Sequence, residues 1–365
     1  MTAADFLPIS GWDHVEFYVG NARQAAHFYE KTFGFEPVAK VALETGSRDR
    51  ASYVLKQGDI RFVFTSALVP DHEIARHCQL HGDGVKTIAL AVRDCDAAMN
   101  AVRLRQATIL QPSQEAADEH GVIKTGVIKY AGDTVIKFVE RGGYRGAFAP
   151  GYKPLRVAAP TVPQVGLRAI DHVVTNVYLG EMNYWAAWFE RVLGFKQLRH
   201  FTDKDISTEY SALMSKVMED GRQIKLPINE PAEGRRKSQI DEYLEWYRGP
   251  GVQHIALSTS DICHAVRMLR ERNIDFLRVP DTYYADLQAR VGKIDESYND
   301  LRELGILVDR DEDGYLLQIF SQPVQDRPTL FFEVIERHGS RGFGRGNFKA
   351  LFVALEREQE RRGNL

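Results

Sequence analysis

Three side chains that can bind a metal stand inside short apolar segments of the second half of the chain. His172 lies in "AIDHVV", His254 in "VQHIAL" and Glu333 in "TLFFEVI", and each segment predicts a β-strand. A carboxylate buried among apolar residues is costly unless a cation or strong hydrogen-bond donors meet it. Two imidazoles and one carboxylate from separate strands form the ligand set that suits non-haem Fe(II), because this set leaves coordination positions open.

Each of these residues also has a purely structural explanation. A single histidine on a strand is more often a hydrogen-bonded core or surface residue, and Glu333 could pair with Arg337 or Arg341. Because side chains alternate between the two faces of a strand, the neighbours of each candidate can be predicted. They are Ile170 and Val174 for His172, Val252 and Ala256 for His254, and Phe331 and Ile335 for Glu333.

A repeat distinguishes between these explanations. Three segments of the first half recur in the same order in the second half: 11–39 matches 169–199, "GDGVKTIAL" (82–90) matches "GPGVQHIAL" (249–257), and 135–146 matches 331–342. The aligned pairs are His14 with His172, Thr87 with His254, and Lys137 with Glu333. Only the second copy carries all three ligand types, so the metal is predicted there and His14 is predicted to be structural.

The elements that position these residues follow from composition and periodicity. The proline-rich segment 145–166 lacks a period and predicts a linker, which divides the chain into a first domain (1–150), a linker (151–168) and a second domain (169–341). Residues 182–193 and 261–273 predict amphipathic helices, ended by Gly194 and begun by Asp261. In the C-terminal segment (342–365), Phe348, Leu351, Phe352 and Leu355 follow helical spacing, which predicts a helix lying on an apolar surface.

Composition limits the other possibilities. The 365 residues have a net charge of −3 and no apolar run long enough to span a bilayer, so neither nucleic acid nor a membrane is an expected partner. The three cysteines share no CxxC spacing, and the N-terminus lacks the pattern of a secretory signal, so a reducing cytoplasm is expected. The histidines outside the candidate site, including His72, His77, His81 and His264, are predicted to be solvated.

Longer motifs carry a family resemblance. The segments "IDHVV", "YSALMSKV", "LPINEPAEGRRKSQIDEYLEWYRGPGVQHIAL", "LLQIF", "RPTLFFEVIER" and "GFGRGNFKALF" resemble the 4-hydroxyphenylpyruvate dioxygenase family of the vicinal oxygen chelate superfamily. The resemblance extends over essentially the whole chain, although the first half matches in architecture more than in site residues. It implies an α+β fold of two open β-barrel domains, each built from paired βαβββ modules, with iron in the second and a C-terminal lid helix.

The resemblance also implies a chemistry and its residues. The iron ligands of the family fall on His172, His254 and Glu333, in agreement with the repeat. The substrate-binding residues of the family fall on Ser215, Asn229, Gln239, Gln253, Gln318, Phe320, Phe331, Phe343, Asn347 and Phe348. The implied reaction converts 4-hydroxyphenylpyruvate and O2 to homogentisate and CO2 by oxidative decarboxylation, ring hydroxylation and migration of the acetate side chain. The implied assembly is a homodimer or homotetramer.

Three alternatives stay open on the sequence alone. 4-Hydroxymandelate synthases share the fold, the iron and the substrate, but hydroxylate the benzylic carbon. Against them, Pro227, Asn229 and Phe348 match the residues that accompany ring hydroxylation in the family. Extradiol ring-cleaving dioxygenases share the metal ligands but lack the "NEP…KSQ" and "GRGNF" motifs. Metal-free binding proteins of the superfamily resemble the first half, with its Thr87 and Lys137.

Overall fold

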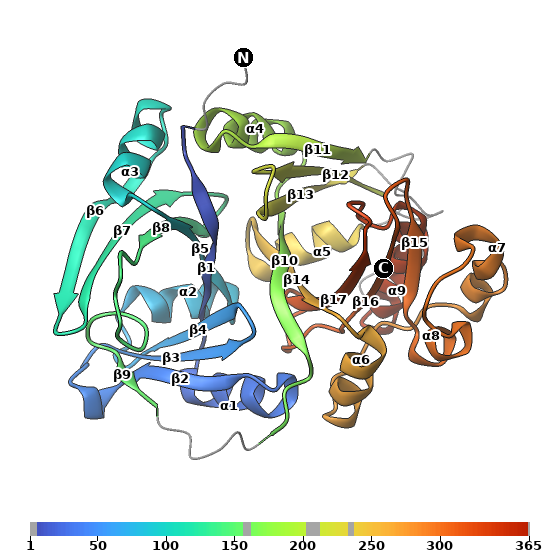
Figure 1. Ribbon diagram of the computed structural model, residues 1–365, viewed down its shortest axis with the longest axis horizontal. Helices are drawn as coiled ribbons and strands as arrows, with labels where there is room; N and C mark the ends of the chain where they lie inside the picture. Colours follow the sequence, from blue (N-terminus) through green and yellow to red (C-terminus); the bar gives the residue numbers. More distant parts are fainter. Residues whose placement is uncertain (1–5, 156–161, 202–211, 233–236, 364–365) are drawn as a thin grey trace.

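Two curled β-sheets lie side by side and make up most of the molecule (Figure 1). The computed structural model describes residues 6–155, 162–201, 212–232 and 237–363. The first half of the chain forms one sheet and the second half forms the other. This is the α+β architecture of two tandem domains that the sequence predicts. Among the described residues, no helix is both long and apolar enough to cross a lipid bilayer.

The first sheet has the strand order β6-β7-β8-β5-β1-β4-β3-β2-β9. Its strands are β1 (Ile9–Tyr18), β2 (Glu36–Val41), β3 (Arg50–Gln57), β4 (Ile60–Ala67), β5 (Gly84–Val92), β6 (Ile109–Asp118), β7 (Gly121–Lys129), β8 (Val135–Glu140) and β9 (Lys153–Pro154). The proline-rich segment leads from the first sheet to the second. Near its start β9 pairs with β2 of the first sheet, and just after its end β10 of the second sheet begins at Leu167.

The second sheet has the strand order β11-β12-β13-β10-β14-β17-β16-β15. Its strands are β10 (Leu167–Asn176), β11 (Lys196–Phe201), β12 (Ala212–Glu219), β13 (Lys225–Ala232), β14 (Gly251–Thr259), β15 (Leu307–Arg310), β16 (Tyr315–Phe320) and β17 (Phe331–His338). In both sheets the two central strands are antiparallel to each other, and each has a parallel partner on its other side.

Helices connect the strands in a repeated order. They are α1 (Ala22–Phe33), α2 (Glu73–His81), α3 (Cys95–Leu104), α4 (Met182–Trp188), α5 (Gln239–Tyr247), α6 (Ile262–Glu271), α7 (Leu287–Val291), α8 (Tyr298–Leu304) and α9 (Phe348–Arg361). A strand, a helix and three strands make one module, and each half contains two such modules, as predicted. Gly194 ends the segment that continues α4 in the left-handed conformation, and the Asp261 side chain caps α6, both as predicted.

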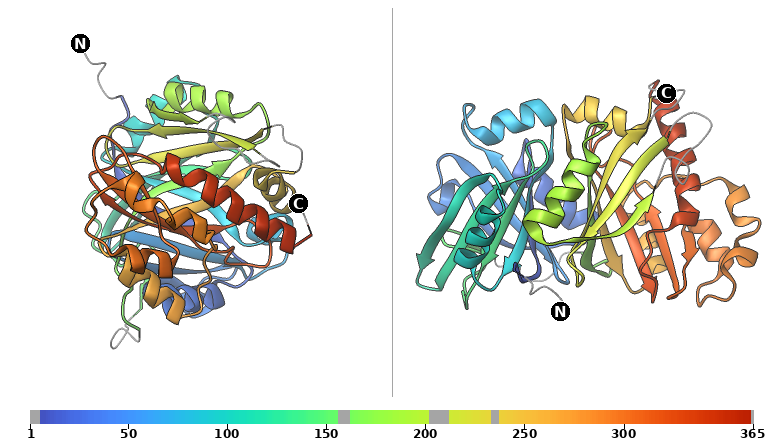
Figure 2. Two further views of the ribbon diagram at one scale, coloured as in Figure 1. Left: turned by 90° about the vertical axis from the view of Figure 1, so that its right-hand side faces the viewer. Right: turned by 90° about the horizontal axis from the view of Figure 1, so that it is seen from above.

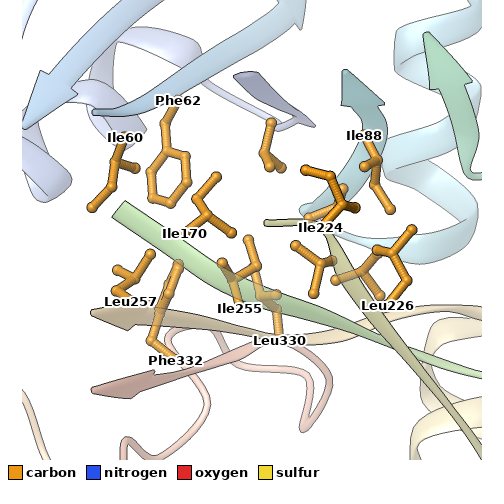
Figure 3. Packing of buried hydrophobic residues seen from close by; sticks show 14 of the residues in the cluster. Ile60, Phe62, Ile88, Ile170, Ile224, Leu226, Ile255, Leu257, Leu330 and Phe332 are labelled. Atoms are coloured by element: carbon orange, nitrogen blue, oxygen red, sulfur yellow. The ribbon is translucent and has the colours of Figure 1, made fainter. Parts of the chain in front are cut away.

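An apolar core holds the two sheets together. Figure 3 shows Ile60, Phe62 and Ile88 of the first half meeting Ile170, Ile255 and Phe332 of the second. The ring of Phe332 lies 5.1 Å from that of Phe33 and 6.0 Å from that of Phe62, measured between centroids. Strand alternation on β17 therefore sends Phe332 into the core between the halves and leaves Phe331 and Glu333 to face the other side of the sheet.

The C-terminal helix α9 covers the open side of the second sheet (Figure 2). It begins at Phe348, as the apolar spacing predicts, and its residues Leu351, Phe352 and Leu355 line a cavity enclosed by that sheet. The apolar face of α9 is buried against the second sheet, while most of its charged residues remain in contact with water. This burial explains why a segment with many charged residues forms a helix packed on the sheet.

Candidate metal centre and active site

A β-bulge sets the direction of His172. On β10, Ile170 pairs with Leu257 and His172 pairs with Ala256, so Asp171 is an extra residue between them. A bulge re-aims the side chains around it. His172 therefore faces the cavity, whereas Ile170 packs in the core between the sheets. The predicted shared face of His172 and Ile170 is wrong for this reason.

A second bulge acts on His254. Val174 pairs with His254 and Thr175 pairs with Val252, so Gln253 is the extra residue on β14. The consecutive side chains of Gln253 and His254 both line the cavity, which regular alternation would forbid. Val252 instead joins the apolar core, so its predicted place beside His254 is wrong as well.

The three candidate ligands converge around one small residue. Ala256 on β14 pairs with His172 on β10 and with Glu333 on β17. The side chain between these two residues is therefore only a methyl group. Glu333 Oε2 lies 3.2 Å from His172 Nε2 and 3.6 Å from His254 Nε2. The ligand atoms of the three residues all lie within 4.8 Å of one another, and all three side chains are buried. Strands that are separated in sequence thus meet at a site that can hold a divalent metal.

The bulge residues also fix the ring orientation of both histidines. His172 Nδ1 lies 2.7 Å from Asp171 Oδ1, and His254 Nδ1 lies 3.0 Å from Gln253 Oε1. A carboxylate and an amide oxygen only accept, so each Nδ1 donates and each Nε2 is the ring nitrogen that faces the candidate site. A neighbour that orients the second ring nitrogen is typical of metal-binding histidines. The donor set and its tautomers therefore fit a metal cation.

Charge compensation keeps Glu333 ionised in this setting. Burial alone would raise the pKa of Glu333, but His172 and His254 lower it to about 2. Burial lowers the pKa of His254, whereas for His172 the nearby Glu333 and Asp171 outweigh burial and raise the pKa. The site therefore presents an anionic ligand to the cavity throughout the neutral pH range.

A series of hydrogen bonds holds the carboxylate of Glu333 in place. Gln318 Nε2 donates to Glu333 Oε1 at 2.9 Å, Asn347 Nδ2 donates to Gln318 Oε1 at 2.8 Å, and the Tyr283 hydroxyl donates to Asn347 Oδ1 at 2.6 Å. Gly344 makes room for these hydrogen bonds, since a Cβ there would overlap Gln318 Oε1. Glu333 is thus held at one oxygen and turns the other toward the histidines.

The cavity that the three candidate ligands help to line has a volume of about 660 Å³, including its mouth. Its walls are mostly apolar, with a few amides and one hydroxyl, as is usual for small-molecule sites. Eight of the ten substrate-binding residues expected from the resemblance line it: Ser215, Asn229, Gln239, Gln253, Gln318, Phe320, Phe331 and Phe343. Phe331 stacks on the His254 ring at 4.8 Å, and Phe343 meets the His172 ring edge-on at 5.1 Å.

Two of the ten expected substrate-binding residues are not among the residues that line the cavity. Asn347 does not line the cavity and instead holds Gln318 from behind. Phe348 is the first residue of α9, but its side chain lies outside the described part of the structure. The expected list omitted further apolar lining residues, namely Val174, Phe201, Leu213, Val217, Pro227, Ile335, Leu351, Phe352 and Leu355. Helical spacing indicated the last three, and strand alternation indicated Val174 and Ile335.

The first half repeats this geometry without the ligand set. Ala89 pairs with His14 and with Lys137, as Ala256 does with His172 and Glu333, so the sequence alignment of the repeat is confirmed. Asp13 is the extra residue of a bulge and lies 2.5 Å from His14 Nδ1. His14 is therefore held like a metal ligand although Lys137 stands at the carboxylate position.

His14→Ala is expected to leave the metal content unchanged and to lower the free energy of unfolding by about 1–3 kcal/mol, since a buried ring is removed. Its ring also packs edge-on against Phe148 at 5.2 Å. Metal analysis together with urea unfolding tests this expectation. A metal ion lost from the His14→Ala protein would contradict the structural role of His14.

The prediction that the histidines outside the candidate site are solvated is wrong for two of them. His77 and His81 on α2 are both buried, and burial lowers the pKa of His77 to about 3. They were missed because the polar residues around them in the sequence do not reveal that α2 packs against α5 of the second half, where His81 stacks on Tyr247. His264 is exposed, as predicted.

Both repeats match a known superfamily. Residues 11–145 and 169–319 match the family model of the Glyoxalase/Bleomycin resistance protein/Dioxygenase superfamily, which defines the class of this two-repeat chain. Curated 4-hydroxyphenylpyruvate dioxygenases align over nearly its whole length. That of Xenopus tropicalis is 49% identical over 96% of this chain and 92% of the relative, and that of Yarrowia lipolytica is 45% identical over 97% and 93%. The chain therefore belongs to the 4-hydroxyphenylpyruvate dioxygenase family and is an enzyme.

Solved structures agree on the fold. A triple mutant of 4-hydroxymandelate synthase from Streptomyces coelicolor superposes with a TM-score of 0.86 at 33% identity, covering 97% of this chain and all of that one. A fusion protein of a xylose isomerase-like TIM barrel with 4-hydroxyphenylpyruvate dioxygenase shares the fold at 22% identity, with a TM-score of 0.73. The alignment covers 96% of this chain and 53% of the fusion.

Proposed function

We propose that this chain is a non-haem Fe(II) dioxygenase that converts 4-hydroxyphenylpyruvate and O2 to homogentisate and CO2. The observation that carries the proposal is the convergence of His172, His254 and Glu333 in a mostly apolar cavity that a few amides also line. The similarity to curated 4-hydroxyphenylpyruvate dioxygenases supports it. The reaction balances without a further reactant, because all atoms of the oxo acid and of O2 appear in the two products.

The proposed ligands are the three residues described above. Iron held by these residues would supply the electrons and the open coordination positions that a 2-oxo acid and dioxygen need in order to react. The bulge residues Asp171 and Gln253 keep both Nε2 lone pairs directed at the site, and Gln318 keeps Glu333 in place. These neighbours act before any substrate binds, so the chain presents a preorganised site.

The cavity wall orients the substrate in this proposal. Ser215 and Asn229 are cross-strand partners on β12 and β13, and Gln239 is the first residue of α5, where Ser238 caps the helix. Their polar atoms can bind the phenol hydroxyl or the carboxylate through directional hydrogen bonds. Phe320 and Phe331 form an aromatic wall near His254 against which a phenol ring can pack. Leu351, Phe352 and Leu355 of α9 exclude water from the reacting end.

The division of labour between the halves is part of the proposal. Residues 1–150 form a structural domain without iron, 151–168 a linker, 169–341 the catalytic domain and 342–365 a lid helix. The first half carries Thr87 and Lys137 at the ligand positions, which supports this division. Residues 156–161 of the linker, 233–236 of the "PINEPAEGRRKSQ" motif and 364–365 of the lid lie outside the described residues. A cytoplasmic homodimer or homotetramer completes the proposal.

A second candidate function is 4-hydroxymandelate synthesis, because a structure of that class superposes over 97% of the chain. Both reactions start from the same substrate and differ in the carbon that is hydroxylated. Pro227 and Asn229 line the cavity, and with Phe348 they match the residues that accompany ring hydroxylation by the resemblance. A tenfold product ratio corresponds to only about 1.4 kcal/mol between competing barriers, so small wall changes can decide the outcome.

Product analysis tests this proposal directly. The iron-loaded protein supplied with 4-hydroxyphenylpyruvate under air is expected to consume O2 and to release homogentisate as the main product. Chromatography against both standards makes the distinction. Dominant 4-hydroxymandelate would replace the ring-hydroxylating assignment, and iron-loaded protein that binds substrate without O2 uptake would favour a binding protein instead.

A further inference from the structure

Two buried histidines and a carboxylate meet at the junction of the two halves, away from the proposed iron site. His77 and His81 lie one helical turn apart on α2, and Asp133 precedes β8. One ligand atom from each of the three lies within 4.8 Å of the others. Histidines at positions i and i+4 of a helix share a face and can bind one metal ion together. The question is whether the contacts around them call for a cation.

The contacts of His81 cannot all be satisfied by a neutral imidazole ring. His81 Nδ1 lies 2.5 Å from the backbone oxygen of Tyr247, and Nε2 lies 2.9 Å from Asp133 Oδ2. Both partners only accept hydrogen bonds, whereas a neutral imidazole has a single N–H. When Nδ1 donates to the carbonyl, the Nε2 lone pair faces a carboxylate. Positive charge is needed there, either as a second proton on the ring or as a bound cation.

His77 favours the bound cation. The residue is 5% exposed, and neither ring nitrogen has a hydrogen-bond partner among the described residues. A buried polar atom without a partner is costly, and a proton on His81 would do nothing for it. The centroids of the two rings are 4.5 Å apart, so one ion could use a lone pair from each. A single cation thus accounts for both anomalies.

We propose that His77, His81 and Asp133 form a second metal site, which takes Zn2+ or a similar borderline divalent ion. Two imidazoles and one carboxylate are a known ligand set for zinc. The Tyr247 carbonyl that holds His81 Nδ1 is the kind of neighbour that orients a metal-binding histidine. Asp133 has a side chain that is 56% exposed, which provides a route for the ion from solvent.

Neighbouring groups are compatible with this site. Lys86 donates to the backbone oxygen of Asp133 at 2.7 Å and leaves the carboxylate to face His81. A third cluster, Glu296, Glu336 and His338, also has ligand-type side chains. There His338 Nε2 lies 3.0 Å from Glu296 and 3.1 Å from Glu336, so one ring N–H can meet both carboxylates and the contacts need no ion. Unpartnered histidine nitrogens set the junction site apart.

The position of the site suggests what the ion would do. Helix α2 belongs to the first half, whereas Tyr247 ends α5 of the second half, and Arg327 also joins the two by donating to the backbone oxygens of Leu80 and Trp246. Zinc at this point would brace the contact between α2 and α5. Helix α5 begins at Gln239, which lines the cavity, so the brace supports one wall of the proposed active site.

Zinc counting on apo-protein tests the proposal. Wild-type chain freed of metal is expected to take up two Zn2+ per chain in equilibrium dialysis, one at each site. A His254→Gln/Glu333→Gln chain, which lacks two of the three proposed iron ligands, is expected to take up one. If that chain takes up none while wild type takes up one, the junction site is overturned and the iron site stands. If both take up one, the iron-site assignment fails and the junction site stands.

The His77→Leu substitution locates the ion. In the His254→Gln/Glu333→Gln background it is expected to weaken Zn2+ binding more than about 100-fold, since loss of an outer-shell partner alone costs about 10–100-fold. It breaks no hydrogen bond of the described structure, so the metal-free melting temperature should not fall. Zn2+ should raise the melting temperature of the background chain and leave that of His77→Leu unchanged.

Two matched variants complete the test. Asp133→Ala removes an exposed ligand and is expected to weaken Zn2+ binding as well, without harming the fold. His338→Gln alters the third cluster and is expected to leave Zn2+ binding unchanged. Undiminished zinc uptake in His77→Leu and Asp133→Ala, or uptake lost in His338→Gln, would overturn the junction site.

Discussion

The Glu333→Ala protein is expected to bind iron more than about 100-fold more weakly and to lose turnover of 4-hydroxyphenylpyruvate. Glu333 is the only anionic member of the proposed ligand set, and replacing neighbours that merely orient a ligand already costs about 10–100-fold in affinity or activity. The substitution also leaves Gln318 Nε2 without its acceptor, at a cost of about 1–3 kcal/mol in stability. Iron content and substrate-dependent O2 uptake are the measurements.

The repeat supplies the matched control. Lys137 occupies the position of Glu333 in the first half, beside Ala89 instead of Ala256. Lys137→Ala should therefore leave both iron content and O2 uptake unchanged. Glu333→Gln keeps a hydrogen-bonding partner for Gln318 while removing the charge, so it separates a folding defect from ligand loss. Full iron and normal turnover in Glu333→Ala would show that Glu333 is no ligand.

The three candidate ligands stand out in the sequence because they break the pattern of their strands. A glutamate between Phe332 and Val334 has no place in an apolar strand unless a partner meets it, and the aligned repeat shows which half has the partners. The order of elements and the C-terminal helix follow from periodicity and capping residues in the same way. Local sequence signals decide these features, so a single sequence contains them.

The bulges and the junction between the halves were not predictable from the same signals. Nothing in "AIDHVV" or "GVQHIAL" marks Asp171 and Gln253 as extra residues, because a bulge depends on the register with the partner strand. The burial of His77 and His81 depends on contacts with α5, about 160 residues further along the chain, as in the His81–Tyr247 contact. Amides such as Asn347 and Gln318 could be assigned to the site, but only the fold shows that one holds the other.

Asp171→Ala is expected to lower the free energy of unfolding by about 3–5 kcal/mol and iron affinity by about 10–100-fold. Asp171 accepts hydrogen bonds from Arg337 Nε at 2.7 Å and Nη2 at 2.8 Å, and it holds His172 Nδ1. Its loss leaves the partly buried guanidinium of Arg337 without its carboxylate. Burial raises the pKa of Asp171, but Arg337 and His172 outweigh it and hold the pKa well below its usual range. The stabilisation is therefore present above about pH 4 and lost as pH falls below that.

The first half again separates structure from function. Asp13 accepts from Arg141 Nε at 2.6 Å and Nη2 at 2.8 Å and meets His14, so the same three residue types are joined in the same way. Asp13→Ala should cost a comparable amount, because it also leaves a half-buried arginine without its carboxylate. It should cost no iron, since His14 has no ligand partners. Denaturant unfolding and iron titration of both variants make the comparison. Equal iron affinity in the two would mean that Asp171 serves the fold alone, whereas a loss confined to Asp171→Ala would show that this contact also orients a metal ligand in the second half.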